Sequence, residues 1–267
     1  MAQAAKLYMV GSNQYGQIGN GTSGAPNNAL TPVEVVGFET GVTAAAVGGA
    51  HALAVKGGAS YGWGLAAYGM LGNGTTGTTS FPTPQPGLLT SGVTTVRAGQ
   101  YYSMFLVGDG LYAAGLNLSN AMGTGDTAAN GTPTAVAGMG SGVTSFGLGA
   151  RHTIVVQNGA VYAWGFNGYG AVGNGASGSG TPDVTTPYQV PGLSSGATMV
   201  SAGSNHNLAL VNGSLWAWGD NQKGQLGSNS TYGPVPSALI GTPQAVLGLP
   251  TGTITDISAG GATAWHS

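Results

Sequence analysis

The chain has 267 residues, of which 42% are hydrophobic and 4% are charged, and its net charge is −2. Five Lys and Arg residues cannot form a basic surface, which argues against duplex nucleic acid and anionic membranes as partners. Cysteine is absent and no apolar run is long enough to cross a bilayer, so a disulfide framework, thiol chemistry and a membrane-spanning helix are excluded.

One unit of sequence recurs along the chain. A short strand-like segment ends in glycine, and a second glycine follows eight residues later. The first glycines are 53, 51, 50 and 54 residues apart. A period near fifty with several short strands per unit is typical of a β-propeller. The two glycines of the five copies are Gly11 and Gly19, Gly64 and Gly72, Gly115 and Gly123, Gly165 and Gly173, and Gly219 and Gly227.

The first half of each copy predicts three strands, most clearly between residues 142 and 164. Residues 142–149 alternate between small and apolar positions, and residues 153–156 form a continuous apolar run. Asn158-Gly159 predicts a two-residue hairpin because both residues adopt positive φ readily. Residues 160–164 then form the returning strand, which ends in Trp164.

The second half of each copy predicts a bend and an outer strand. The bend covers residues 165–173, and its glycines are expected to adopt positive φ. The Gly-x-Gly elements are not read as phosphate loops, because neither Lys-Ser/Thr nor a helix follows them. Residues 186–190 form the outer strand, with Pro187 at its start, where a ladder donor is not needed.

The two ends of the chain are halves of one copy. The chain opens on residues 7–11, which lack a preceding first half, and closes on residues 257–265, which lack a following second half. Pairing these strands would complete a blade and cover both exposed edges. The prediction is therefore one all-β domain, residues 1–267: a five-bladed propeller with four-stranded blades, closed by N- and C-terminal strands that share one blade.

The motifs resemble the regulator of chromosome condensation (RCC1-like) repeat family. They are the Ala-Gly-x-x-His element ending at His51, His152 and His206, the aromatic-x-Trp-Gly element, and the bend of residues 15–21. In two copies Tyr102 and Thr263 replace the histidine. The resemblance implies a propeller that binds proteins, although founding members have seven repeats. Some relatives exchange nucleotides on a small GTPase and sit on chromatin. The low basic count argues against the chromatin role here.

Two columns of residues invite a chemical interpretation. Three histidines could bind zinc, but His51, His152 and His206 lie in different copies at a repeat-defining position, which favours a structural role. Large rings between neighbouring blades likewise explain the tryptophan column better than cofactor stacking does. We expect no metal and no cofactor. The tryptophans are Trp63, Trp164 and Trp218.

No catalytic group stands out. A glycosidase needs two facing carboxylates, and the seven acidic residues fall mostly in loops of different copies. A lyase or glycosidase on a propeller scaffold is therefore the least favoured alternative, and we expect a protein that is not an enzyme.

The segments after the bends vary in length, and unequal loops on a rigid scaffold are where binding surfaces usually form. The longest, residues 228–242, ranks first as a contact region, ahead of tyrosines at one repeated bend position. Packing within the bend is the alternative role of these tyrosines. The contact candidates are Tyr15, Tyr68, Tyr169, Ser228, Asn229 and Tyr232.

The low charge favours an extracellular particle over a free cytosolic protein, which usually stays soluble through surface charge. Residues 1–11 do not read as a secretory signal, and virion components need none. The leading hypothesis is therefore a phage tail or capsid accessory, possibly receptor-binding. Its partners would be other structural proteins of the particle or a host surface glycan or protein. The alternative is a bacterial cell-surface or cytoplasmic adaptor that binds a protein.

Overall fold

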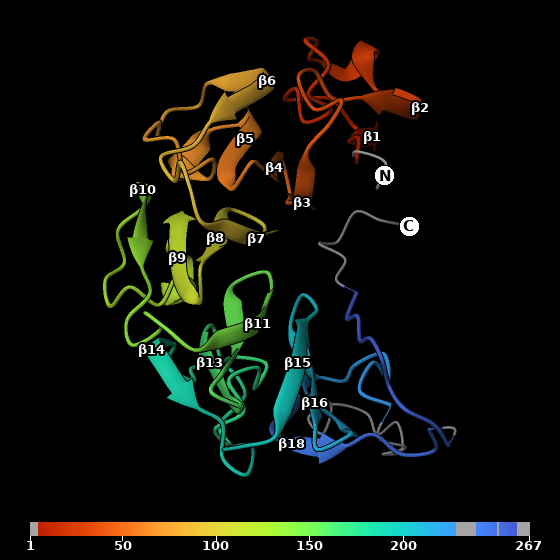
Figure 1. The fold of residues 1–267 in the computed structure, drawn as a ribbon. Helices are drawn as coiled ribbons and strands as arrows, with labels where there is room; N and C mark the ends of the chain where they lie inside the picture. Colours follow the sequence, from red (N-terminus) through yellow and green to blue (C-terminus); the bar gives the residue numbers. More distant parts are fainter. Residues whose placement is uncertain (1–4, 228–238, 250, 261–267) are drawn as a thin grey trace. The chain divides into compact units, whose positions relative to one another are not determined.

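A computed structural model describes residues 5–227, 239–249 and 251–260 (Figure 1). In this part of the chain there are eighteen β-strands and three single-turn 3-10 helices. The contacts divide the chain into two compact units, residues 1–117 with 128–136, and residues 118–127 with 137–267. The helices of the described residues are single turns, so none of them could cross a membrane.

The first unit contains a two-stranded sheet and two four-stranded antiparallel sheets. The small sheet pairs β1 (Tyr8–Gly11) with β2 (Ala29–Glu34). The next sheet is β3 (Val42–Val47), β4 (His51–Lys56), β5 (Ala59–Leu65) and β6 (Ser80–Pro86). The third sheet is β7 (Val93–Ala98), β8 (Tyr102–Val107), β9 (Gly110–Gly115) and β10 (Asn130–Ala135). The short helices are η1 (Ala25–Asn27) and η2 (Ala67–Gly69).

The second unit contains two four-stranded sheets built to the same plan. One is β11 (Val143–Leu148), β12 (His152–Gln157), β13 (Ala160–Gly165) and β14 (Val184–Gln189). The other is β15 (Ala197–Ala202), β16 (His206–Val211), β17 (Ser214–Asp220) and β18 (Leu239–Ala245). The helix η3 (Leu118–Asn120) also belongs to this unit.

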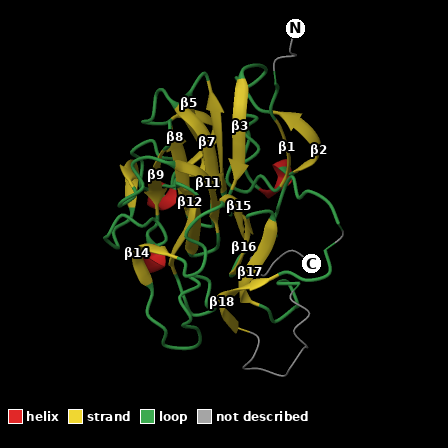
Figure 2. Ribbon diagram, turned by 60° about the horizontal axis from the view of Figure 1, so that its bottom comes forward, coloured by secondary structure: helices red, strands yellow, loops and turns green. Residues whose placement is uncertain are grey.

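Within each unit, consecutive sheets pack face to face through their first and second strands. β3 contacts β7, and β11 contacts β15, as their neighbouring positions in Figures 1 and 2 show. A cluster of Leu53, Val55, Val96 and Phe105 fills the space between the sheets β3–β6 and β7–β10. Because the second strand is covered on both sides, it reads as a continuous apolar run rather than an alternating one.

The predicted hairpin between the second and third strands is confirmed. Asn158 and Gly159 have φ of 50° and 77°, and Asn212 and Gly213 have 51° and 77°. The prediction of positive φ at the bend glycines is confirmed as well, with values from 66° to 90° at Gly19, Gly21, Gly72, Gly74, Gly123, Gly125, Gly173 and Gly175.

The predicted position of the outer-strand proline is wrong. Pro187 is the fourth residue of β14, not its first. There β14 bulges away from its partner. Val184 faces Gly165 and Tyr188 faces Ala163, so three residues of β14 lie opposite the single residue Trp164 of β13. Residues inside a bulge are free of the ladder, which allows a proline without a lost hydrogen bond.

The β1–β2 sheet has two strands in the described part of the chain. The C-terminal segment expected to complete it includes Thr263 and Trp265, which lie outside the described residues. Closure by a shared blade, and the single domain over residues 1–267, therefore stay predictions.

Candidate binding surface: the bend face

Within each unit, two sets of loops share one end of each sheet, and we call this end the bend face of that unit. In an antiparallel four-stranded sheet, the loop between strands one and two and the loop between strands three and four lie at the same end. The first set is residues 48–50, 99–101, 149–151 and 203–205; the second is residues 12–28, 66–79, 116–129, 166–183 and 221–227.

A buried asparagine organises the bends. The Asn13 side-chain oxygen accepts a hydrogen bond from the backbone N–H of Ile18 at 3.0 Å, and Asn167 does the same for Val172 at 3.0 Å. Both side chains are fully buried. The sequence interpretation missed these residues, although asparagine stands two residues after the first glycine in four of the five copies, at Asn13, Asn117, Asn167 and Asn221.

Three of the bends are tied to the following sheet by a tryptophan. The indole N–H of Trp63 donates to the Gln17 carbonyl at 2.9 Å, and that of Trp218 donates to the Ala171 carbonyl at 2.9 Å. Trp164 makes the same bond to Ala121, and all three rings are fully buried. The tryptophan column therefore joins the bend of one sheet to the third strand of the next.

The histidines make a second link between sheets. His51 Nε2 lies 2.8 Å from Ser103 Oγ, and Ser103 Oγ donates to the Met70 carbonyl at 2.6 Å. His152 Nε2 lies 2.9 Å from Asn207 Oδ1, while Asn207 Nδ2 donates to the Ala171 carbonyl. The residue after the histidine position in the next sheet thus connects a histidine to a bend.

These bonds fix the protonated nitrogen. The Ser103 hydroxyl donates its hydrogen to the Met70 carbonyl, so it can only accept a hydrogen bond from His51. Asn207 Oδ1 can likewise only accept, so both histidines carry their hydrogen on Nε2. His51 Nδ1 is then a buried acceptor with no recorded partner. Burial lowers the pKa of His51 and of His152 to about 4, in the latter case against the raising effect of the Asn207 hydrogen bond. Burial also lowers the pKa of His206.

The three tyrosine candidates lie on the bend face in different environments. Tyr15 is 39% exposed, and Tyr68 is 46% exposed. The Tyr68 ring contacts Tyr101 edge to face, with 6.3 Å between centroids. Tyr169 is half-buried and packs against Phe166 at 5.8 Å. Tyr68 also has φ of 62°, an uncommon backbone conformation for a bulky residue.

Two variable positions sit on a constant backbone frame. The residue before the histidine position accepts a backbone hydrogen bond from the residue after the first glycine, at 2.8–3.0 Å in four sheets. Arg151 and Phe166 form one such pair, with the guanidinium carbon 4.0 Å from the ring centroid. The frame is constant while the side chains change, which is typical of recognition positions. The other pairs are Ala50 with Leu65, Tyr101 with Leu116, and Asn205 with Asp220.

The candidates Ser228, Asn229 and Tyr232 lie outside the described residues. The predicted loop of residues 228–242 is too long, because Leu239–Thr242 is the beginning of strand β18, where Leu239 faces Asp220 and Ile240 faces Gly219. The contact assignment of Tyr15, Tyr68 and Tyr169 stays a prediction.

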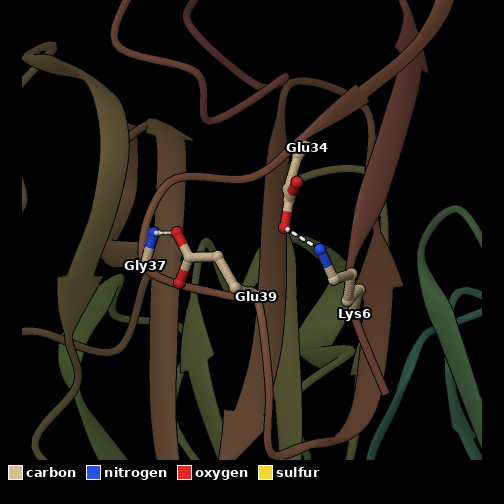
Figure 3. A network of polar contacts seen from close by, with 4 residues as sticks. All are labelled: Lys6, Glu34, Gly37 and Glu39. Carbon is tan, nitrogen blue, oxygen red and sulfur yellow. Dashed lines mark hydrogen bonds and ion pairs between the residues drawn. The ribbon is translucent and has the colours of Figure 1, made fainter. Parts of the chain in front are cut away.

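Two acidic residues near β2 are engaged in local contacts (Figure 3). Lys6 Nζ donates to Glu34 at 3.2 Å, and Glu39 accepts from the Gly37 backbone N–H at 3.0 Å. Hydrogen bonds from the backbone lower the pKa of Glu39. Within the described ranges, no group of three His, Asp or Glu residues is placed to hold a metal ion.

Comparisons with known proteins agree with the geometry. The family model "Regulator of chromosome condensation (RCC1) repeat" matches residues 5–55, 58–106, 158–210 and 212–264. The chain is 30% identical over 230 residues to the ultraviolet-B receptor UVR8 of Arabidopsis thaliana, covering 83% of this chain and 50% of the receptor. It is also 30% identical over 247 residues to the secretion-regulating guanine nucleotide exchange factor of Bos taurus, covering 88% and 53%. It thus spans about half the length of these relatives.

The fold agrees with solved structures of this kind. Yeast RCC1 (Prp20), solved bound to Kap60, has a TM-score of 0.81 at 23% identity, with 97% of this chain and 61% of that chain covered. Human WBSCR16 has a TM-score of 0.78 at 18% identity, with 95% and 70% covered. The predicted all-β, RCC1-like propeller fold is confirmed, and the chain belongs to the RCC1 repeat family.

Proposed function

We propose that this chain is a protein-binding propeller that engages its partner through the bend face. One observation carries the proposal. In four sheets the residue after the first glycine donates the same backbone hydrogen bond to the residue before the histidine position, whereas the side chains of the two residues vary from apolar to cationic to acidic. The solved relative Prp20 is bound to Kap60, which supports a protein partner for a propeller of this kind.

The exposed aromatic residues add to the support. Tyr68 and Tyr101 are 46% and 37% exposed and touch each other. Tyrosine is enriched at interfaces because its ring buries a large area and its hydroxyl still finds a partner. The positive φ of Tyr68 is a strain that binding function commonly explains.

The setting that we propose is an extracellular particle, a phage virion in the first place, in which the protein is an accessory and not an enzyme. A charge content of 4% supports this setting, because few surface charges leave neutral partners. The adaptor hypothesis at a cell surface or in the cytoplasm shares the binding face and differs only in location. Co-purification with particles separates the two: absence from purified particles contradicts the virion setting and leaves the adaptor.

The face assignment is tested by substitutions that leave the frame intact. Tyr68→Gly removes the ring and relieves the backbone strain, and Tyr101→Ala removes its neighbour. We expect the double variant to fold and to bind the partner, recovered by cross-linking from the source cells or particles, at least about tenfold more weakly. Val36→Ser is the matched control, since Val36 is 50% exposed but lies outside the bend face. Equal binding by all three proteins contradicts the proposal.

A further inference from the structure

A hollow of about 300 Å³ lies in the second unit, at the end of the sheet opposite the bend face. It is lined by the loop Gly192–Ser195 together with Val211, Asn212, Ser214 and Trp216. None of the lining residues is charged. The volume is at the lower end of the range for ligand sites, which is room for one side chain or a small molecule.

The same place is filled from within the chain in two other sheets. Lys56, the last residue of β4, donates from Nζ to the Gly37 carbonyl at 2.6 Å. Gln157, the last residue of β12, donates from Nε2 to the carbonyls of Gly138 and Ser141, both at 2.8 Å. In each case a long side chain crosses to the loop that precedes the first strand of its own sheet and donates N–H hydrogen bonds to carbonyls of that loop.

The sheet β15–β18 lacks this side chain. The last residue of β16 is Val211, which is too short and carries no donor. Gly192 and Ser195 stand where Gly138 and Ser141 stand, four residues and one residue before the glycine that precedes the first strand. Among the described residues, no hydrogen bond to the carbonyl of Gly192 or Ser195 is recorded. In the sheet β7–β10 the second strand also ends in valine, at Val107. That sheet differs in the loop, where Leu88 occupies the position that corresponds to Gly192.

The surroundings suit a cation on an aliphatic stem. Trp216 is half-buried at the wall, where the other sheets have tyrosine. An ammonium group near an indole face is attracted to it, and the Lys56 ammonium already sits 5.4 Å from the centre of the Phe38 ring. The Ser194 and Ser214 hydroxyls at the rim can accept further hydrogen bonds.

We propose that this hollow binds the lysine side chain of a partner protein, which supplies in trans the donor that Lys56 and Gln157 supply in cis. The stem would pack on Val211 and Trp216, and the ammonium would donate to the carbonyls of Gly192 and Ser195. This site is independent of the bend-face proposal, since it uses the other end of the strands and can be tested without the partner.

The test is a titration followed by two-dimensional ¹H–¹⁵N NMR, with Nα-acetyl-lysine N-methylamide as the probe. We expect shifts of the Gly192–Gly196 amides and of the Trp216 indole N–H. The norleucine analogue has the same stem without the ammonium and is expected to bind roughly tenfold or more weakly, because the charged hydrogen bonds are missing. Equal shifts by both probes, or none by the lysine probe, overturn the proposal.

Three variants sharpen the result. Val211→Gln and Val211→Lys put the missing donor back, and each is expected to abolish the lysine-specific shifts and to raise the melting temperature. Gln157→Val opens the same place in the sheet β11–β14 and is expected to create new lysine-dependent shifts at Gly138 and Ser141. Unchanged binding by a folded Val211→Gln protein contradicts the assignment of the site.

Discussion

A buried histidine in this protein is a neutral hydrogen-bond donor. His51 and His152 each donate a hydrogen bond from Nε2–H to a residue of the next sheet. That residue in turn donates a hydrogen bond to a carbonyl of a bend. A second proton would charge a ring nitrogen that is buried away from solvent. The folded protein therefore favours the neutral form of the buried imidazole, so the free energy of unfolding depends on pH.

The expected pH dependence follows from the lowered pKa values. An unfolded histidine takes up a proton near pH 6.5, whereas buried His51 and His152 do so only near pH 4. Stability is therefore constant above about pH 6.5, falls as pH drops from 6.5 to 4, and falls no further from this cause below 4. Each shift corresponds to roughly 3 kcal/mol. Urea unfolding at pH 7.5 and pH 4.5 measures the loss, and a double His51→Gln, His152→Gln variant should lose most of the dependence.

Ser103→Ala tests the link itself. The change leaves the His51 Nε2–H without its acceptor and the Met70 carbonyl without its donor, both in a buried place. We expect the free energy of unfolding to fall by roughly 1–3 kcal/mol. Ser91→Ala, at an exposed position, is the control and should change it by less than about 0.5 kcal/mol. Similar melting curves for both variants would show that the link contributes nothing.

At the scale of elements, three bends pack closely against the outer-strand bulge of the next sheet. Gly16 lies against Pro82, Gly69 against Gly131, and Gly170 against Gly241. The approach is so close that a Cβ added at Gly16, Gly69 or Gly170 would lie 2.3–2.7 Å from the nearest backbone atom of its neighbour. The bulges that carry the prolines are therefore shaped to receive a bend. Glycine at this position serves both the turn and the close approach.

Gly69→Ala should be among the most damaging single changes. Its Cβ would clash with the Gly131 backbone, and its φ of 88° is strained for alanine. Gly138→Ala is the matched control, because Gly138 has φ of 71° and nothing within 4 Å of its added Cβ. We expect about 1 kcal/mol for the control from backbone strain alone and at least about 3 kcal/mol for Gly69→Ala. Thermal unfolding measures both, and equal losses would mean that the bend does not depend on this contact.

For the whole molecule, the low charge content predicts a stability that hardly depends on salt. The Lys6–Glu34 ion pair is exposed, with side chains 49% and 34% accessible, and such pairs contribute little. The links between sheets run instead through neutral indole, imidazole, hydroxyl and amide groups. We expect melting temperatures at 20 mM and 500 mM NaCl to agree within about 2 °C. A shift of ten degrees would point to charge networks that the composition argues against.

Much of this protein could be predicted from its sequence, because its signals repeat. The period, the Asn-Gly hairpins and the bend glycines each depend on local backbone preferences, so they are visible in single residues such as Asn158 and Gly173. The outer strand predicted at residues 186–190 begins two residues after the observed start of β14 at Val184, for a related reason. Pro187 reads locally as a strand start, and only the bulge on β14, formed where the neighbouring sheet's bend approaches, permits it inside the strand.

The candidate surface divides in the same way. The sequence alone determined the repeat, the family resemblance and the tyrosine and histidine columns, since these follow from residue types at fixed spacing. Only the tertiary structure decided that Ser103 and Asn207 complete the histidine links, that Arg151 stacks on Phe166, and that Val211 leaves a place open which Gln157 fills elsewhere. Those contacts join residues from separate strands and sheets, and the distance between them depends on how the sheets pack.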